Sequence, residues 1–265
     1  MNSDSFFLFG ASVPTLVLHM APFVVVFVVG FIYVILRRLS VIQRMSLNAG
    51  IYGNVIVVLA GTYSIVLGFA IIVVWGFHGK QIEVQSKEVS ALENIESLSR
   101  SFPIQIRREI QDDILTYVNL VQDVEWPLLD EGGQSEQAAD VLRALLHVYT
   151  DMPGKERYST IISQSLRDYN DVTHNRRLRI ASSYYRVDTK LWLVLIIGGI
   201  VIVLQSFFLD VKSGLFHWWL ITVQTMVISL AISLVYELDH PYSGVVKIEP
   251  NQFSRILTGM QDLRH

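Results

Sequence analysis

Residues Asn54–Phe77 read NVIVVLAGTYSIVLGFAIIVVWGF, and this stretch decides the fold. It contains no Asp, Glu, Lys or Arg. A helix of about 20 apolar residues, rising roughly 1.5 Å per residue, crosses the hydrocarbon core of a bilayer. Because that core lacks water, every backbone N–H and C=O must be bonded within the segment, and a helix does this. The stretch predicts a membrane-spanning helix that continues into water, since no Pro or turn signal follows before Arg100.

Three further apolar runs are long enough to span a membrane. They are Val13–Leu36, Leu191–Leu209 and Leu215–Tyr236. Tryptophans at the start of the last two runs suit the membrane–water interface. The link between these two runs is short, so they are predicted to form a helical hairpin.

The composition agrees with a membrane protein that has a sizeable polar part. The chain is 51% hydrophobic and 17% charged, whereas soluble domains have about 25% charged residues. The net charge of −3 predicts no nucleic-acid partner. The chain has no cysteine, which excludes disulfides, thiolate metal sites and thiol catalysis.

The segment between spans two and three, residues 78–190, reads as helical throughout. Apolar residues recur there at helical spacing, with breaks predicted at Phe102-Pro103, from Trp126-Pro127 to Gly133, and at Pro153-Gly154. We therefore predict an all-α membrane protein with four transmembrane helices and a helical extramembrane domain inserted between helices 2 and 3. Its parts are an N-terminal membrane pair (1–77), the helical domain (78–190), a membrane hairpin (191–236) and a polar tail (237–265).

The distribution of basic residues predicts the orientation. The flanks of the middle region carry more Lys and Arg than the first loop, which has Arg37, Arg38 and Arg44. By the positive-inside rule, both termini and the middle domain are cytoplasmic.

No catalytic set is visible. There is no nucleophile elbow, HExxH motif or phosphate-binding loop, and the histidines are scattered without metal-ligand spacing. We expect no enzyme activity, no cofactor and no metal site. The spans also carry no charged residue and offer only hydroxyls, glycines, histidines and amides such as Thr62, Gln205 and Gln224, whereas ion-coupled transporters usually use an intramembrane carboxylate or histidine relay. Spans without charged residues are still compatible with a passive ion pathway that has a hydrophobic gate.

Several short motifs, in this order and spacing, resemble the bestrophin-like family of uncharacterised membrane proteins. They are Leu67-Gly68-Phe69, Glu125-Trp126-Pro127, Asn175-Arg176-Arg177-Leu178-Arg179 and Leu238-Asp239-His240-Pro241-Tyr242-Ser243-Gly244. The resemblance covers about Asn54 to Pro250 and implies an integral protein of a bacterial inner (plasma) membrane.

A more distant resemblance is to true bestrophins, which are pentameric anion channels. The segment Ser64–Phe69 is similar to the bestrophin neck helix, where apolar side chains one turn apart constrict the pore. Carried over by position, Gly61, Ile65 and Phe69 would line the pore, and their spacing places them on one helix face. Gly61 stands where a bulky residue is expected, so that level would be open. The alternative is that Ile65 and Phe69 pack against other helices or lipid.

The basic run before span three allows two interpretations. Arg176, Arg177 and Arg179 either raise the local anion concentration or anchor the span at the lipid headgroups. The acidic cluster that binds calcium in animal bestrophins has no counterpart after Tyr236, so calcium gating is not implied.

Two functional hypotheses follow. The first is an anion-conducting homo-oligomer in which span two lines a hydrophobic throat. The resemblance implies that the oligomer is a pentamer. Its partners would be membrane lipid, inorganic anions and other copies of the same chain. The second is a non-conducting membrane protein whose cytoplasmic helical domain binds a partner or senses a signal. Its motivation is the long polar region with no chemistry of its own.

Overall fold

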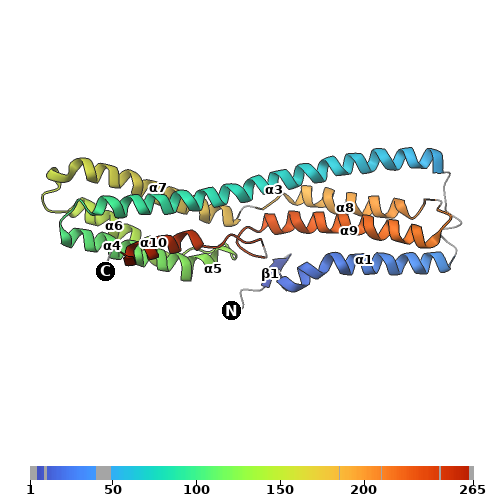
Figure 1. Cartoon of the computed structure of the whole chain (residues 1–265), viewed down its shortest axis with the longest axis horizontal. Coiled ribbons are helices and arrows are strands. Elements are labelled where there is room, and N and C mark those ends of the chain that lie inside the picture. Colours follow the sequence, from blue (N-terminus) through green and yellow to red (C-terminus); the bar gives the residue numbers. More distant parts are fainter. Residues whose placement is uncertain are drawn as a thin grey trace. The chain divides into compact units, whose positions relative to one another are not determined.

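The computed structural model describes residues 5–8, 11–39, 49–184, 186–209, 211–244 and 246–262. Nearly all of this part of the chain is helical (Figure 1). Four of the described helices are long and apolar enough to cross a membrane, which confirms the predicted fold class. Arg44, one of the basic residues behind the predicted orientation, lies outside the described residues.

The first span is preceded by a small hairpin that the sequence did not suggest. Strands β1 (Ser5–Leu8) and β2 (Ala11–Pro14) pair antiparallel. Helix α1 then runs over Thr15–Arg38, so Val13 and Pro14 belong to a strand and not to the span. The helix therefore lies two residues further along the chain than the predicted span.

Helix α3 (Ala49–Ser99) contains the stretch that opened the sequence analysis. It continues without interruption through the charged residues after Phe77, as the lack of helix-breaking signals predicted. Its first part is apolar and its second part is amphipathic, with Leu92 and Ile95 fully buried.

Helices α8 (Thr189–Ser206) and α9 (Gly214–Asp239) form the predicted hairpin. Helix α9 packs against both α1 and α8. One small core between them contains Tyr33, Phe207 and Ile221. The Tyr33 hydroxyl donates a hydrogen bond to the Gly214 carbonyl at 3.1 Å, which ties α1 to the start of α9.

The polar region folds into a bundle of shorter helices around one large core. Leu92, Ile114, Tyr117, Leu145 and Phe253 are among its fully buried side chains. The helices are α4 (Ile104–Leu120), the π-helix η1 (Val121–Glu125), α5 (Trp126–Leu129), α6 (Glu136–Asp151), the 3₁₀ helix η2 (Lys155–Tyr158) and α7 (Ser159–Tyr184). The tail adds α10 (Asn251–Asp262), whose Phe253, Ile256 and Met260 enter this core.

The predicted breaks at Phe102-Pro103 and Pro153-Gly154 are confirmed, since both dipeptides lie between helices. Gly154 has φ +69°, a left-handed conformation that glycine adopts at little cost. The break predicted from Trp126-Pro127 begins too early. The chain passes from α4 through η1 into α5, and Pro127 lies in the first turn of α5, directly after the π-helical turn.

The chain divides into two compact units. The first contains the N-terminal hairpin, α1, α3 up to Gly76, α8 and α9. The second contains α3 from Phe77 onward together with α4 to α7 and α10. The tail, which the sequence did not assign to the helical domain, is therefore part of the second unit.

Candidate functional site

One side of α3 packs against its own chain in the first unit. Tyr63, Ala70 and Val74 are buried there. The Tyr63 hydroxyl donates to the Leu195 carbonyl of α8 at 3.0 Å. A Cβ on Gly198 would lie 2.6 Å from the Tyr63 ring, so this glycine makes room for the tyrosine.

The opposite side of α3 has no packing partner within the described chain. Ile65 is 76% exposed and Phe69 is 66% exposed. A Cβ on Gly61 would have no heavy atom within 4 Å. At roughly 100° per residue, the centre of the Gly61, Ile65 and Phe69 face is about 160° from the buried side. The structure thus brings the three predicted pore-lining residues onto one free face.

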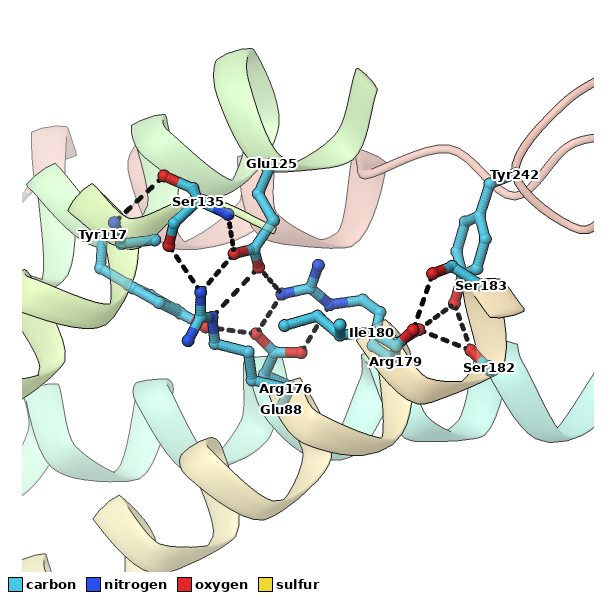
Figure 2. Close-up of polar contacts among 11 residues, drawn as sticks. Glu88, Tyr117, Glu125, Ser135, Arg176, Arg179, Ile180, Ser182, Ser183 and Tyr242 are labelled. Atoms are coloured by element: carbon cyan, nitrogen blue, oxygen red, sulfur yellow. Dashed lines mark hydrogen bonds and ion pairs between the residues drawn. The ribbon is translucent and has the colours of Figure 1, made fainter. Parts of the chain in front are cut away.

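In the second unit, four charged side chains form a buried network (Figure 2). The guanidinium of Arg179, on α7, binds Glu88 of α3 with distances of 2.9 and 3.0 Å. It also donates to Glu125, at the end of η1, at 2.9 Å. Arg176, one turn earlier on α7, holds the same Glu125 with a bidentate contact. Two carboxylates and two guanidiniums therefore balance each other out of contact with water.

Neutral groups add further hydrogen bonds to the network, although Nη1 of Arg179 is buried without a hydrogen-bond partner among the described residues. The Tyr117 hydroxyl donates to Glu88 at 2.6 Å, and Arg176 donates to the Ser135 carbonyl at 2.8 Å. Ser135 also donates its backbone N–H to Glu125 at 3.0 Å, and its hydroxyl caps α6 by accepting from Ala138 N. Because buried ions are tolerated only when paired and hydrogen-bonded, these contacts explain how four charges can lie in the core.

The π-helix places Glu125. Its wider turn interrupts the α-helical ladder between α4 and α5, and such bulges are frequent at functional sites. Trp126 follows at once, and the Arg179 guanidinium lies 5.2 Å from the centre of its ring. The Trp126 indole N–H donates to the Ile248 carbonyl, which links the network to the tail.

The network fixes the charge states of its members. Burial would raise the pKa of Glu125, but the hydrogen bond from Arg176 and the two guanidinium charges outweigh it and lower that pKa. Burial would likewise lower the pKa of Arg179, yet the charge of Glu88 raises it well above its usual value. The pKa of Tyr117 is raised by burial and by the charge of Glu88. All three groups stay in their ordinary charge state at neutral pH.

The model of the Bestrophin-like domain family matches residues 22–253, which is most of the chain. The chain belongs to the Bestrophin-like family. This confirms the family resemblance drawn from the short motifs. No curated protein matches the sequence.

Solved structures of low sequence identity share the fold. Two variants of a bacterial bestrophin homologue from Klebsiella pneumoniae each match with a TM-score of 0.71 and 12% identity. The matches cover 93% of this chain and 98% of the first variant, and 92% and 99% for the second. A further structure of the Klebsiella homologue has a TM-score of 0.68 at 12% identity, with 91% of this chain and 96% of that chain covered.

In this bestrophin-like chain the predicted basic run divides into two. Arg176 and Arg179 are 8% and 1% exposed, and their charges are matched by Glu125 and Glu88. The Arg177 side chain is exposed, and it donates to the Thr173 carbonyl of its own helix. Arg177 alone of the three therefore presents its charge to solvent.

The family motifs have clear structural tasks. Glu125-Trp126-Pro127 supplies the network with its carboxylate and its aromatic ring. Asp239 accepts from the Val187 backbone at 2.7 Å, just before α8, and so orients the entry to that helix. The Tyr242 hydroxyl lies 2.9 Å from the Ser182 hydroxyl and fixes the tail on α7.

Sequence reasoning missed several residues of these sites. Val58 and Ile72 are exposed and extend the free face of α3 by one turn at each end. Their spacing of three residues from Gly61 and Phe69 would have identified them. The burial of Glu88 could not be predicted, because the sequence of a charged helical segment does not show which of its carboxylates is buried. Among the described residues, no group of three or more His, Asp or Glu side chains could hold a metal ion.

Proposed function

We propose that this protein is a homo-oligomeric anion channel in which α3 lines the ion pathway. The observation that supports this proposal is the free apolar face of α3. Ile65 and Phe69 on this face are largely exposed, whereas the opposite face of the helix packs against other helices of the same chain. A single chain does not need this face for its own fold. Several copies with these faces toward a common axis would surround a hydrophobic throat.

A glycine at the edge of the free face supports assembly. Gly68 lies beside Ile65 and Phe69, and a Cβ on it would meet no heavy atom of the described residues within 4 Å. In membranes, small residues let neighbouring helices approach closely, since van der Waals packing drives their association. Gly198 shows the contrast, because Tyr63 of the same chain fills the space beside it.

The proposed gate is an apolar constriction at Ile65 and Phe69. Such constrictions close by dewetting, and a small rotation of the lining helix opens them to water. At the level of Gly61 the proposed pathway would be wide, because glycine has no side chain to narrow it. Inorganic anions would be concentrated by exposed basic groups such as Arg177, while Arg176 and Arg179 serve the fold.

We further propose that the protein resides in a bacterial inner membrane, in contact with lipid, with both termini and the helical domain in the cytoplasm. The excess of Lys and Arg beside the helical domain supports this orientation. A pentamer is the proposed stoichiometry.

Chloride efflux tests the proposal. The particle mass of the purified protein is measured by light scattering to give its oligomeric state. The protein is then inserted into chloride-loaded liposomes, and chloride efflux is measured. Phe69→Ala removes the bulk of the throat and is expected to raise efflux above the parent. Phe27→Ala is the matched control, because Phe27 is a phenylalanine on α1 that is also largely exposed. A monomeric particle, or assembled Phe69→Ala protein with no more efflux than the parent, would overturn the assignment.

A further inference from the structure

A polar groove of about 640 Å³ lies between α3 and α7 in the second unit. Ser90 and Asn94 of α3 and Asp168, Asp171 and Asn175 of α7 are among its lining residues. The residues from each helix recur every three or four positions, so each helix presents one face to the groove. None of these five residues belongs to the buried network or to the free face of α3.

Asp168 is unusual among the buried carboxylates of this unit. It is 5% exposed, and its two oxygens accept hydrogen bonds only from amides, Asn94 at 3.3 Å and Gln164 at 3.2 Å. Glu88 and Glu125 have arginines, and Glu96 has Arg100 at 2.9 Å. A buried carboxylate without a cation is costly, because neutral donors do not balance its charge. Within the described chain, Asp168 lacks the counter-charge that the other three have.

The surroundings of Asp168 favour an organic cation over a metal ion. Each carboxylate oxygen has a second lone pair, and Asn175 donates its own amide to the Asp171 carbonyl, which leaves its side-chain oxygen as an acceptor. Ammonium and guanidinium groups need one or two such acceptors. Calcium needs six to eight oxygen ligands, and the described residues offer no group of three metal-binding side chains.

The basic residues of the groove do not fill this role. Lys87 is paired with Glu83 at 2.6 Å on the rim, and its hydrogen bond and charge lower the pKa of that carboxyl. Lys80 stands fourteen residues before Asn94, which is about 21 Å along the helix. Among its Lys, Asp and Glu side chains, the lining has Lys80 and Lys87 against Glu83, Asp168 and Asp171, which is one more acidic than basic group.

We propose that this groove binds a cationic nitrogen, an organic ammonium or guanidinium, with Asp168 as its counter-ion. The cation is supplied either by a free amine or by a Lys or Arg side chain of a second copy. Only the second source depends on the proposed homo-oligomer. Neither source depends on ion conduction.

Binding is measured by calorimetry with 1,4-diaminobutane as the probe and 1,4-butanediol as the neutral control. If a free amine is the source, the diamine binds, the diol does not, and Asp168→Asn weakens diamine binding at least about tenfold, as expected for loss of a charge-assisted hydrogen bond. Asp123→Asn, at an exposed carboxylate on η1, leaves the affinity unchanged.

Thiol labelling distinguishes the two sources, since the chain has no cysteine. The Ser90→Cys variant places a thiol in the groove, and Ser97→Cys places one on an exposed site of the same helix. With a free amine as the source, the diamine slows maleimide labelling of Ser90→Cys alone. With a second copy as the source, Ser90→Cys is protected in the oligomer without diamine, and Asp168→Asn removes that protection.

The inference is overturned if the diamine does not bind and Ser90→Cys labels in the oligomer as fast as Ser97→Cys. It is also overturned if Asp168→Asn changes neither binding nor labelling. The light-scattering mass and the chloride efflux of the same samples are read separately. An assembled, conducting protein whose groove neither binds the diamine nor is protected in the oligomer refutes this inference and leaves the proposed function standing.

Discussion

Removing the Arg179 guanidinium should destabilise the helical unit severely. Arg179→Met keeps the length and apolar stem of the side chain but leaves Glu88 with only Tyr117 as a partner. Glu125 keeps Arg176. Stranding one buried charge costs about 3–5 kcal/mol, because its desolvation is no longer offset. For a unit of this size, each kcal/mol corresponds to roughly 4 °C, so the unfolding midpoint should fall by about 12–20 °C.

The double variant Glu88→Gln with Arg179→Met isolates the charge pair. The introduced glutamine could still accept from Tyr117, and no unpaired charge remains, so most of the lost stability should return. The assay is thermal unfolding of the full chain in detergent at one scan rate. Trp126 supplies the fluorescence signal of this unit, because its ring lies against the Arg179 guanidinium and the other four tryptophans belong to the first unit. A single variant within about 2 °C of the parent, or a double variant as unstable as the sum of its singles, would refute this reasoning.

Three further predictions concern pH and packing. The fold lowers the pKa of Glu125 from its usual 4.5, so the ionised carboxylate stabilises the fold above pH 4.5, and this stability is lost as the pH falls through the folded pKa. Glu125→Gln should therefore reduce the dependence of the unfolding midpoint on acid pH. A variant whose midpoint falls with pH as steeply as that of the parent would contradict this prediction. Burial, followed by the charges of neighbouring carboxylates, raises the pKa of Asp113 from 3.8 to about 6, so the ionised form of Asp113 destabilises the fold. Asp113→Asn should raise the unfolding midpoint at pH 8, whereas below about pH 4 removing the charge should not change it. An effect of the substitution that is the same at both pH values would count against this prediction. Gly198→Ala places a Cβ 2.6 Å from the Tyr63 ring and should cost about 1–3 kcal/mol of stability by overpacking. The control Gly61→Ala places a Cβ that meets no heavy atom of the described residues within 4 Å, so it should lower the unfolding midpoint of the monomer little or not at all. Equal losses for the two variants in detergent would show that the α3 face is already packed.

The membrane helices were predictable because hydrophobicity and length alone specify them. Helix α3 begins five residues before its predicted span and continues past it, because the segment that follows Phe77 also lacks a break. The shared face of Gly61, Ile65 and Phe69 follows from helix geometry. The start of α1 was misplaced because strand pairing before it takes up Val13 and Pro14, and short apolar runs do not distinguish strand from helix.

The charge network could not be predicted. Glu88 and Arg179 are 91 residues apart in sequence, and no local pattern connects them. The spacing of Arg176 and Arg179 places them on one face of α7, but a charged pair at that spacing is ordinarily solvated. Only the tertiary fold shows that this face is inward, while Arg177 faces out. Tertiary packing likewise orders the tail as α10 against the core.

Accessibility of the α3 face to a permeating reagent tests the central claim most directly. The chain has no cysteine, so Ile65→Cys carries a single thiol on that face, and Val24→Cys provides a matched exposed position on α1. Both variants are placed in chloride-loaded liposomes and treated with a negatively charged methanethiosulfonate. If α3 lines an anion pathway, the reagent changes efflux through Ile65→Cys and leaves Val24→Cys as before. Unchanged efflux through a conducting, assembled Ile65→Cys protein, with the thiol shown to be unmodified, would contradict the account.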